Sequence, residues 1–373
     1  EEEKRGKLTM KRKFLLGAAL ALVAALACGL IAGCSNSSEA QKTDASKDSA
    51  QYAPIAVSYL NKSYYEDIIV GDNKGFFKDC GPEVTLNPVE GSGQQSVEAL
   101  LAGSVDIACT GQGPVADAIK QKGDEIVILA ANKEICGEQA YVAGPSIVVV
   151  PYDKKADNKA DVKASFEAAA LLKGGPVVVG VQNGSTTANN FKSWLKFMEI
   201  DFTDFGADGT ETVKLVDMKA NTLAEALATG NDIDMMAASQ PYPSAAIEKV
   251  PGAYQVGTNL DNDAVNATML ITTKKVMSEK EASIKAFLKA DGVATDYLNT
   301  NAADSIKICA DAEGVDEAAV KAIFDNSKFK VTLDDEAVKI MLKACKSKGV
   351  EIDEAGLKAQ MPLLDWVNGG MKD

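Results

Sequence analysis

Short runs rich in β-branched residues alternate with segments of helical periodicity from Pro54 onward. This alternation is typical of βαβ units, in which a helical crossover joins neighbouring parallel strands. The expected strands are 55–59, 84–89, 105–109, 126–131, 146–151, 177–181 and 268–272. The expected helices are 63–70, 94–102, 114–122, 164–172, 282–298, 316–324, 334–346 and 355–366, with a further helix after Thr187 that contains Phe191, Leu195 and Met198. The pattern therefore predicts an α/β protein with mostly parallel sheets flanked by helices.

A weak internal repeat relates residues 98–108 to residues 225–235. Each copy is a helix ended by a glycine, followed by an Asp-bearing turn and an apolar strand. A polar turn and a proline follow both copies, which indicates two lobes of similar construction. The alternative is that the copies are two ordinary αβ units of one sheet.

Three segments match the S/T-x-x-E/Q capping box that begins many helices. They are Ser92–Gln95, Thr222–Glu225 and Ser278–Glu281. The first two precede the repeat copies, and the third precedes a helix-rich tail that we expect to pack back on the first lobe.

The N-terminal region has the features of an export signal. Met10 is the first credible initiator, which makes residues 1–9 an over-read start, and Lys11–Lys13 precede an apolar run from Phe14 to Leu26. A basic start before such a run is typical of a secretory signal, although a retained membrane anchor is the alternative.

The segment Leu30–Cys34 resembles the lipobox of bacterial lipoproteins, in which the cysteine is lipidated and becomes the mature N-terminus. The alternative is a structural or free cysteine at the end of a membrane helix. Residues 34–53 are polar and lack an apolar period, so we expect a flexible tether. This pattern predicts a protein anchored through lipid on Cys34 to the extracytoplasmic face of the cell membrane.

The composition excludes several kinds of chemistry. Histidine is absent, and Arg5 and Arg12 are the only arginines. Ser-His-Asp and Cys-His nucleophiles, histidine metal sites and arginine clamps are therefore unavailable downstream. The net charge of −14 disfavours nucleic acid as a partner, because such binding requires clustered Lys and Arg. We expect no metal and no cofactor.

The cysteines do not suggest a disulfide framework or a zinc site. Five remain after the lipobox, an odd number without any CxxC pair: Cys80, Cys109, Cys136, Cys309 and Cys345. We expect mostly reduced, buried thiols.

Polar turns follow several of the expected strands. Ligands of open α/β sheets bind beyond the carboxyl ends of strands, where helix N-termini present unpaired N–H groups. The residues expected to line a ligand site at these turns are Ser58, Tyr59, Ser92, Gly111, Gln112, Ser185, Thr186 and Gln240. Lys62 is the candidate for a single positive charge. The walls of the ligand site are expected to include the tyrosines Tyr59, Tyr64, Tyr65 and Tyr242. The alternative is that these tyrosines pack at a surface edge.

The turn Gln182–Thr187 is the strongest of these candidates, because it joins a valine-rich strand to a helix with an apolar stripe. Its hydroxyls and backbone donors suit a small anion or polar group. The alternative is that Ser185 or Thr186 only caps the helix. Asp106, Asp232 and Asp234 fall at strand starts, where we interpret them as turn formers.

Three segments, Gly91–Ala108, Leu172–Thr187 and Leu223–Pro241, together resemble the nitrate/sulfonate/taurine-type substrate-binding proteins of ABC importers. The resemblance spans roughly Pro54 to Ala290. It implies a two-lobed, type II periplasmic-binding-protein fold that closes on its ligand by a hinge motion. The implied division is residues 54–144 and 251–373 in lobe 1, and residues 145–250 in lobe 2. The charged stretch 154–163 and the missing arginine depart from the family.

The resemblance implies a solute-binding protein that delivers a small polar or anionic molecule to an ABC permease and its ATPase. We expect a monomer without enzymatic activity. The alternatives are an extracellular enzyme with a Ser/Thr nucleophile and a lysine base, and a scaffold lipoprotein without a transport role. A neighbouring family that builds the thiamine pyrimidine consumes an active-site histidine, which this chain lacks.

Overall fold

The computed structural model describes most of the chain after the expected tether. The described residues are 52–62, 64–135, 139–209, 211–325 and 327–372. The predicted leader, the lipidation of Cys34 and most of the tether lie outside these residues. No helix in the described part has the length and apolarity needed to cross a membrane.

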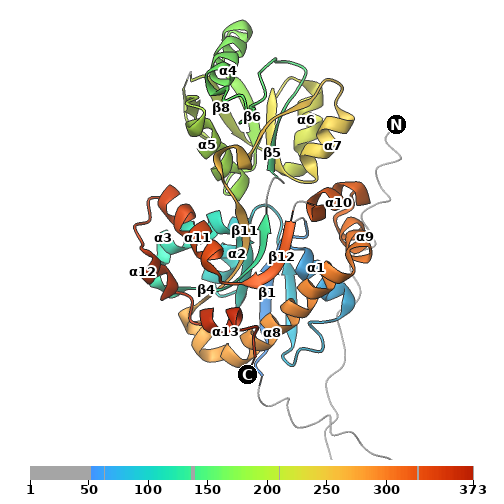
Figure 1. The fold of residues 1–373 in the computed structure, drawn as a ribbon, viewed down its shortest axis with the longest axis vertical. Coiled ribbons are helices and arrows are strands. Elements are labelled where there is room, and N and C mark those ends of the chain that lie inside the picture. The colour runs from blue at the N-terminus through green and yellow to red at the C-terminus, as the bar shows by residue number, and fades with distance from the viewer. Residues whose placement is uncertain (1–51, 63, 136–138, 210, 326, 373) are drawn as a thin grey trace, which may run out of the picture. The chain divides into compact units, whose positions relative to one another are not determined.

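The described strands form two mixed sheets (Figure 1). In order across the first sheet, they are β12 (Ser327–Thr332), β4 (Ile126–Ile135), β11 (Asn266–Thr273), β3 (Ile107–Gly111), β1 (Ile55–Tyr59) and β2 (Val84–Pro88). Across the second, they are β10 (Tyr254–Thr258), β5 (Gln139–Ala143), β9 (Met235–Ser239), β6 (Val177–Val181), β8 (Val213–Asp217) and β7 (Phe202–Thr203). We call the first sheet and its helices lobe 1, and the second sheet and its helices lobe 2.

Helices cover both sheets. Those of lobe 1 are α1 (Glu66–Lys74), α2 (Gly93–Leu101), α3 (Gln112–Lys122), α8 (Lys274–Thr300), α9 (Ala302–Glu313), α10 (Glu317–Asp325), α11 (Asp335–Ser347), α12 (Glu354–Lys358) and α13 (Leu364–Asn368). Those of lobe 2 are α4 (Lys159–Lys173), α5 (Thr186–Phe197), α6 (Leu223–Thr229) and α7 (Tyr242–Lys249).

The internal repeat occupies equivalent places in the two sheets. The first copy is α2 and β3, and the second is α6 and β9. Each of these strands has a parallel neighbour on one side, β1 or β6, and an antiparallel neighbour on the other. The copies therefore belong to different sheets, so the one-sheet alternative is wrong.

The chain crosses between the lobes twice, and the second sheet extends beyond the expected 145–250. β5 lies before this range and β10 after it, yet they pair with each other, and β5 also pairs with β9. The strand expected at 146–151 is wrong. In this segment the Tyr254 hydroxyl accepts from the Val149 N–H at 2.9 Å and donates to the Val149 carbonyl at 2.8 Å. These bonds take the place of the backbone bonds that a neighbouring strand would make.

Of the three predicted capping boxes, one begins a helix as expected and two do not. The capping box Ser92–Gln95 is present at the start of α2. The one at Thr222 is wrong, because its hydroxyl donates to the Lys219 carbonyl instead. Ser278 lies inside α8, whose N-cap is Thr273, and the backbone kinks nearby at Lys280. The helix expected at 355–366 is divided into α12 and α13.

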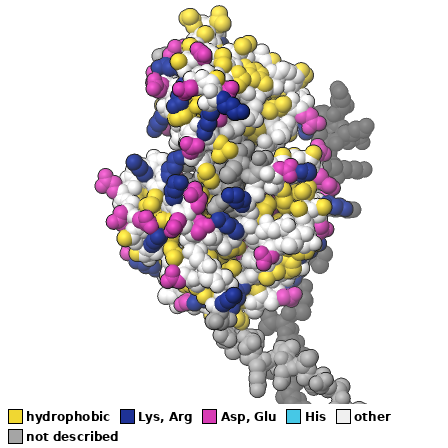
Figure 2. Space-filling view, in the orientation of Figure 1, with side chains coloured by type: hydrophobic (Ala, Val, Ile, Leu, Met, Phe, Trp, Pro, Cys, Tyr) yellow, Lys and Arg dark blue, Asp and Glu magenta, His cyan; other side chains and the backbone are white. Residues whose placement is uncertain are grey.

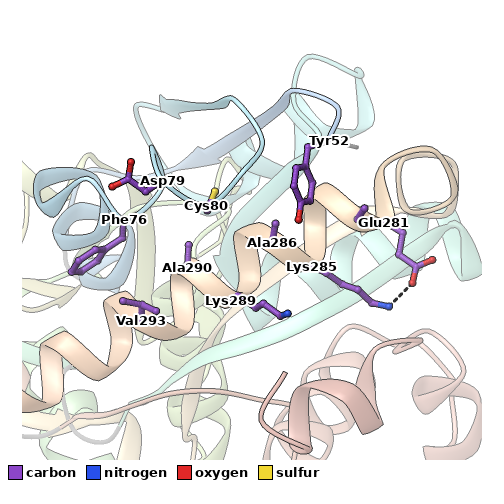
Figure 3. Close-up of a pocket in the computed structure, with 11 residues that line it drawn as sticks. Tyr52, Phe76, Asp79, Cys80, Glu281, Lys285, Ala286, Lys289, Ala290 and Val293 are labelled. Carbon is purple, nitrogen blue, oxygen red and sulfur yellow. Dashed lines mark ion pairs between the residues drawn. The ribbon is translucent and has the colours of Figure 1, made fainter. Parts of the chain in front are cut away.

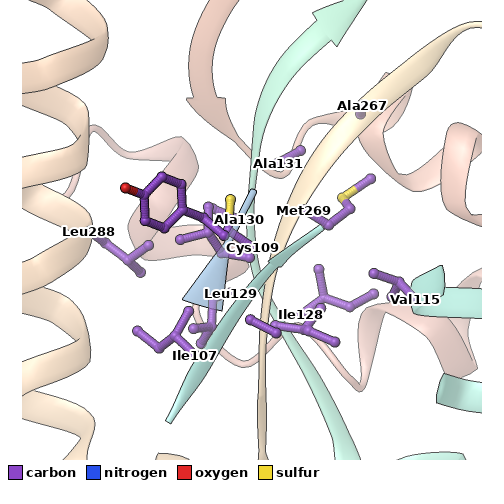
Figure 4. Close-up of a cluster of buried hydrophobic side chains, with 14 of the residues drawn as sticks. Ile107, Cys109, Val115, Ile128, Leu129, Ala130, Ala131, Ala267, Met269 and Leu288 are labelled. Carbon is purple, nitrogen blue, oxygen red and sulfur yellow. The ribbon is translucent and has the colours of Figure 1, made fainter. Parts of the chain in front are cut away.

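Each lobe has its own apolar core. Figure 4 shows part of the lobe 1 core, where Ile107 of β3 lies on the side of Leu288 of α8 and Met269 of β11 points toward Val115 of α3. In lobe 2, Trp194 is fully buried, stacks on Phe191 and contacts Tyr141. Separate cores let the lobes move as units. Acidic and basic side chains are interspersed over the face shown in Figure 2.

The described cysteines are thiols and form no disulfide among themselves. Cys109, Cys309 and Cys345 are buried and Cys80 is half-buried, as the sequence predicts. Cys136 lies outside the described residues. Burial raises the pKa of the Cys345 thiol to about 11, which makes it a poor nucleophile at neutral pH.

Candidate functional site

A cavity of about 60 Å³, which we call the chamber, lies between the lobes. Its walls come from the turns after β1, β3, β6, β8 and β9, together with residues near the starts of β5 and β11. The polar and aromatic residues that line it are Lys62, Tyr64, Tyr65, Gln112, Gln139, Gln182, Ser185, Thr186, Thr187, Ser239, Gln240 and Tyr242. The chamber therefore collects the strand ends at which the sequence placed a ligand site.

Five of the eight predicted site residues line the chamber. They are Gly111, Gln112, Ser185, Thr186 and Gln240. Lys62, Tyr64, Tyr65 and Tyr242 line it as well, so these tyrosines are not simply surface residues.

Ser58, Tyr59 and Ser92 are not among the chamber's lining residues. Ser58 is fully buried within lobe 1, and its hydroxyl approaches the Ser96 carbonyl at 3.4 Å. Tyr59 belongs to the lobe 1 core. Ser92 caps α2, and its hydroxyl faces Gly184 of lobe 2, where an added Cβ would lie 3.3 Å away. Ser92 therefore contacts the opposite lobe without lining the chamber.

Two helices begin at the chamber, one from each lobe. Gly111 is the N-cap of α3, and Ser185 is the N-cap of α5. The Ser185 hydroxyl accepts from the Ala188 N–H at 3.0 Å and donates to the Gln182 carbonyl at 2.7 Å. The first N–H groups of a helix have no partner within it and carry the positive end of its dipole. The two ends together favour an anion or a strongly dipolar group.

The lobes are in direct contact around these helix starts. A Cβ on Gly113 would lie 2.7 Å from the Asn189 side-chain nitrogen of lobe 2. The structure is therefore a closed arrangement of the lobes, made possible by residues without side chains at the points of closest approach.

Lys62 is the charged residue among the chamber's lining, and no acidic side chain lines it in the described part of the chain. Its ammonium approaches the Gly91 carbonyl at 3.5 Å. Burial lowers the pKa of Lys62 to about 8, against an opposing effect of the Glu313 carboxylate. The described lining of the chamber is therefore neutral or positive around neutral pH, and the Glu313 carboxylate acts on Lys62 and Tyr242 from outside this lining.

An outer cavity of about 210 Å³ adjoins the chamber. The two share Lys62, Gln182, Ala220 and Tyr242, and the outer cavity adds Lys219 of lobe 2. A bound molecule with a longer tail has room to extend toward the surface along this path.

Tyr64 has a left-handed backbone, with φ of 92°. Such a conformation is costly for a residue other than glycine and is held by its surroundings, here by the Thr268 hydroxyl, which donates to the Tyr64 carbonyl at 2.9 Å. This strained residue lies in the turn after β1 and lines the chamber.

Sequence reasoning missed one polar lining residue of the chamber, Gln139. Thr187 and Ser239, whose hydroxyls lie 3.0 Å apart, stand inside turns that the sequence had identified. Gln139 had no such signal. It starts an antiparallel strand that the sequence analysis did not recognise, and only the pairing of β5 with β9 brings it to the chamber.

The Asp residues at strand starts are structural. The Asp106 carboxylate accepts from the Ala56 N–H and from the Lys280 ammonium, both at 2.9 Å. Buried Asp234 pairs with Lys173 and accepts from the Val178 N–H at 2.8 Å. These bonds tie strands together at the edge opposite the chamber, in keeping with the prediction that they are not acids of the site.

The arrangement expected of a Ser/Thr-Lys enzyme is not formed. The Ser185 hydroxyl donates to a carbonyl and the Thr187 hydroxyl contacts Ser239. In the described contacts, the Lys62 ammonium bonds neither of them. A lysine base must reach its nucleophile to activate it.

A separate groove of about 780 Å³ runs along α8 on lobe 1. Figure 3 shows Ala286 and Ala290 on the helix, with Tyr52 and Phe76 on either side and the Glu281–Lys285 ion pair at one end. The groove is larger than the chamber, but all of its lining residues belong to lobe 1. We therefore place the candidate site in the chamber.

The fold and the chamber define a two-lobed periplasmic-binding-protein architecture, in which a ligand site lies between two α/β lobes. The chain belongs to the NMT1-like family, whose model matches residues 48–311. No curated protein sequence matches the chain.

Solved structures with the same fold are distant in sequence. The periplasmic aliphatic sulphonate binding protein SsuA from Escherichia coli has a TM-score of 0.62 at 17% identity, over 83% of this chain and 92% of that one. The alkanesulfonate-binding protein SsuA from Xanthomonas axonopodis pv. citri, bound to MOPS, has a TM-score of 0.61 at 14% identity, over 83% and 97%. The nitrate-binding protein NrtA from Synechocystis PCC 6803 has a TM-score of 0.52 at 17% identity, over 72% and 69%.

Proposed function

We propose that this chain is the solute-binding component of an ABC importer and captures a small polar or anionic molecule in the chamber. The observation that carries the proposal is the meeting of two helix N-termini, one from each lobe, in a chamber whose described lining includes Lys62 and no acidic residue. Such a site binds an anion or the negative end of a dipole. The sulfonate- and nitrate-binding proteins of the same fold support this class of ligand.

The proposed ligand class is set by the donors present. The chamber offers amides, hydroxyls and the ammonium of Lys62 as donors. The described part of the chain contains no arginine, so lysine is the cation that can bind an anion there. Nitrate, sulfonates, taurine, bicarbonate and pyrimidine-like molecules all present acceptors of suitable size. The protein binds and releases its ligand unchanged and passes it to a permease and its ATPase.

Export and anchoring complete the proposal. The lipobox at Leu30–Cys34 supports a lipoprotein held at the extracytoplasmic face of the cell membrane. The polar residues that follow then serve as a tether between lipid and receptor.

The test is thermal unfolding with a panel of nitrate, ethanesulfonate, taurine, bicarbonate, uracil and glycine. A ligand at 100 times its dissociation constant stabilises the folded state by about 2.7 kcal/mol, so at least one compound should raise Tm clearly. Choline chloride serves as the cationic control. If no compound raises Tm, or if choline does so equally, the proposal is wrong.

A further inference from the structure

A network of amide side chains, buried except for half-buried Asn190, joins the lobes beside the chamber. Asn190 of α5 donates through Nδ2 to Gln139 Oε1 at 2.8 Å and to Asn266 Oδ1 at 2.6 Å. Gln139 starts β5 in lobe 2, whereas Asn266 starts β11 in lobe 1. The first bond thus lies within lobe 2, and the second crosses between the lobes.

The lobe 1 side of this network is fixed. Gln112 Nε2 donates to the same Asn266 Oδ1 at 2.7 Å, and Gln112 Oε1 accepts from the Ala267 N–H at 3.1 Å. Gln112 and Asn266 are 5% and 1% exposed. Because these amides are shielded from water, breaking the Asn190–Asn266 bond leaves a donor or acceptor unsatisfied until water enters.

The same network reaches the ligand site. Gln112 and Gln139 both line the chamber. Gln139 is 1% exposed, and its Nε2 has no hydrogen-bond partner within the described chain. An unpartnered buried amide donor at a chamber wall is satisfied when a ligand supplies an acceptor.

We propose that Asn190 is a latch residue that holds the lobes closed through Asn266 and orients Gln139 toward the ligand. Opening the lobes carries α5 away from β11 and breaks the Asn190–Asn266 bond, while the Asn190–Gln139 bond moves with lobe 2. The orientation of Gln139 toward a ligand rests on the proposed function. The latch itself consists of bonds between this chain's own side chains, so it can be tested without knowing the ligand.

The test is amide hydrogen exchange of the ligand-free protein, comparing Asn190→Ala with the unaltered chain. The reporters are the amides of residues 116–119, which make the first hydrogen bonds within α3 in the opposite lobe. Loss of one hydrogen bond of ordinary net strength should speed their exchange about tenfold. The interior strand β6 of lobe 2 should keep its protection.

Lys192→Ala is the matched control. It removes a contact from the same helix, but its partner Asp204 lies within lobe 2, at 2.7 Å. This variant should leave the α3 amides unchanged. Asn266→Ala breaks the latch from lobe 1 and should also expose them, and the Asn190→Ala/Asn266→Ala double variant should exchange no faster than Asn266→Ala alone.

Unchanged exchange at residues 116–119 in Asn190→Ala would overturn the latch. Equal acceleration in β6 would overturn it too, because it would indicate general destabilisation of lobe 2. Neither measurement uses a ligand, so failure here is separate from failure of the thermal panel.

Discussion

Gly111 and Thr186 touch across the two lobes: a Cβ placed on Gly111 would lie 2.3 Å from Thr186 Oγ1. Gly111 caps α3 and Thr186 is the first residue of α5. The absence of a side chain at position 111 lets two helix N-termini approach around one chamber. A receptor that closes on a small molecule needs such close approach, because its donors must reach the ligand from both sides.

Replacing Gly111 with alanine should weaken ligand binding while leaving each lobe folded. The backbone of Gly111 is extended, with φ of −77°, so alanine fits its own lobe and clashes only with Thr186. We expect at least a tenfold loss of affinity by calorimetry for the best compound of the panel, about 1.4 kcal/mol.

Gly175→Ala is the control for this change, because nothing lies within 4 Å of a Cβ at that position. It should bind normally. Adding Thr186→Ala to Gly111→Ala removes the clashing hydroxyl and should restore lobe closure, seen as a smaller radius of gyration in X-ray scattering with ligand. A double variant that stays open would contradict the role assigned to this contact.

Lys62 should make the binding of an anion depend on pH. Its pKa of about 8 means that the ammonium is charged below this pH and neutral above it. Affinity for nitrate or ethanesulfonate should therefore fall as pH rises through about 8. Lys62→Gln should bind more weakly and lose this dependence, and Lys219→Gln in the outer cavity should keep it. A pH-independent affinity in the unaltered protein would count against Lys62 as the ligand's cation.

The buried pair Asp67 and Asp291 should make lobe 1 less stable at high pH. Asn132 donates to both carboxyl groups, to that of Asp291 at 2.7 Å. Burial raises the pKa of Asp67, and burial together with the neighbouring Asp67 raises that of Asp291 well above the usual range. Because the folded state holds the proton more tightly, this contribution to stability is complete below the unfolded pKa near 4 and is lost as pH rises through the folded values.

Asp291→Asn keeps the shape and removes the charge. It should raise the free energy of unfolding at about pH 8 by roughly 1–3 kcal/mol, measured by urea denaturation. Asp304→Asn is the contrasting variant, because its partner Lys74 lowers the pKa of Asp304, whose contribution is lost as pH falls. If Asp291→Asn destabilised the protein equally at all pH values, the charge of this buried pair would not cause the expected loss of stability at high pH.

Cys34 should carry the membrane anchor. In a bacterial host that processes lipoproteins, Cys34→Ala should abolish incorporation of labelled palmitate and leave the protein unlipidated. Cys80→Ala, outside the lipobox, should not alter labelling. Equal labelling of both variants would place the lipid elsewhere.

The sequence predicted the parts of the fold that local signals determine. β1 and β6 have the expected bounds, because each is a short apolar run with clear turns on both sides. The capping box at Ser92 formed because the Gln95 side chain accepts from the Ser92 N–H at 2.7 Å and the Ser92 side chain accepts from the Gln95 backbone. Thr222 also has a glutamate three residues later, but its hydroxyl donates to the Lys219 carbonyl and does not cap the helix.

The parts that depend on long-range pairing were not predictable. β5 and β10 are ordinary sequences that become strands by pairing with each other across more than a hundred residues. With them the sequence analysis missed Gln139, the chamber residue that connects to Asn190. Ser58 follows a strand pattern but faces its own lobe, because alternate residues of a strand point to opposite faces.

The most direct test of the account is a crystal structure of the chain grown with the most stabilising compound of the panel. We expect its density in the chamber, within hydrogen-bond distance of Gln112 from lobe 1 and of Thr186 or Ser185 from lobe 2. Density only in the groove along α8, or contacts from a single lobe, would contradict the claim that the two lobes together form the binding site.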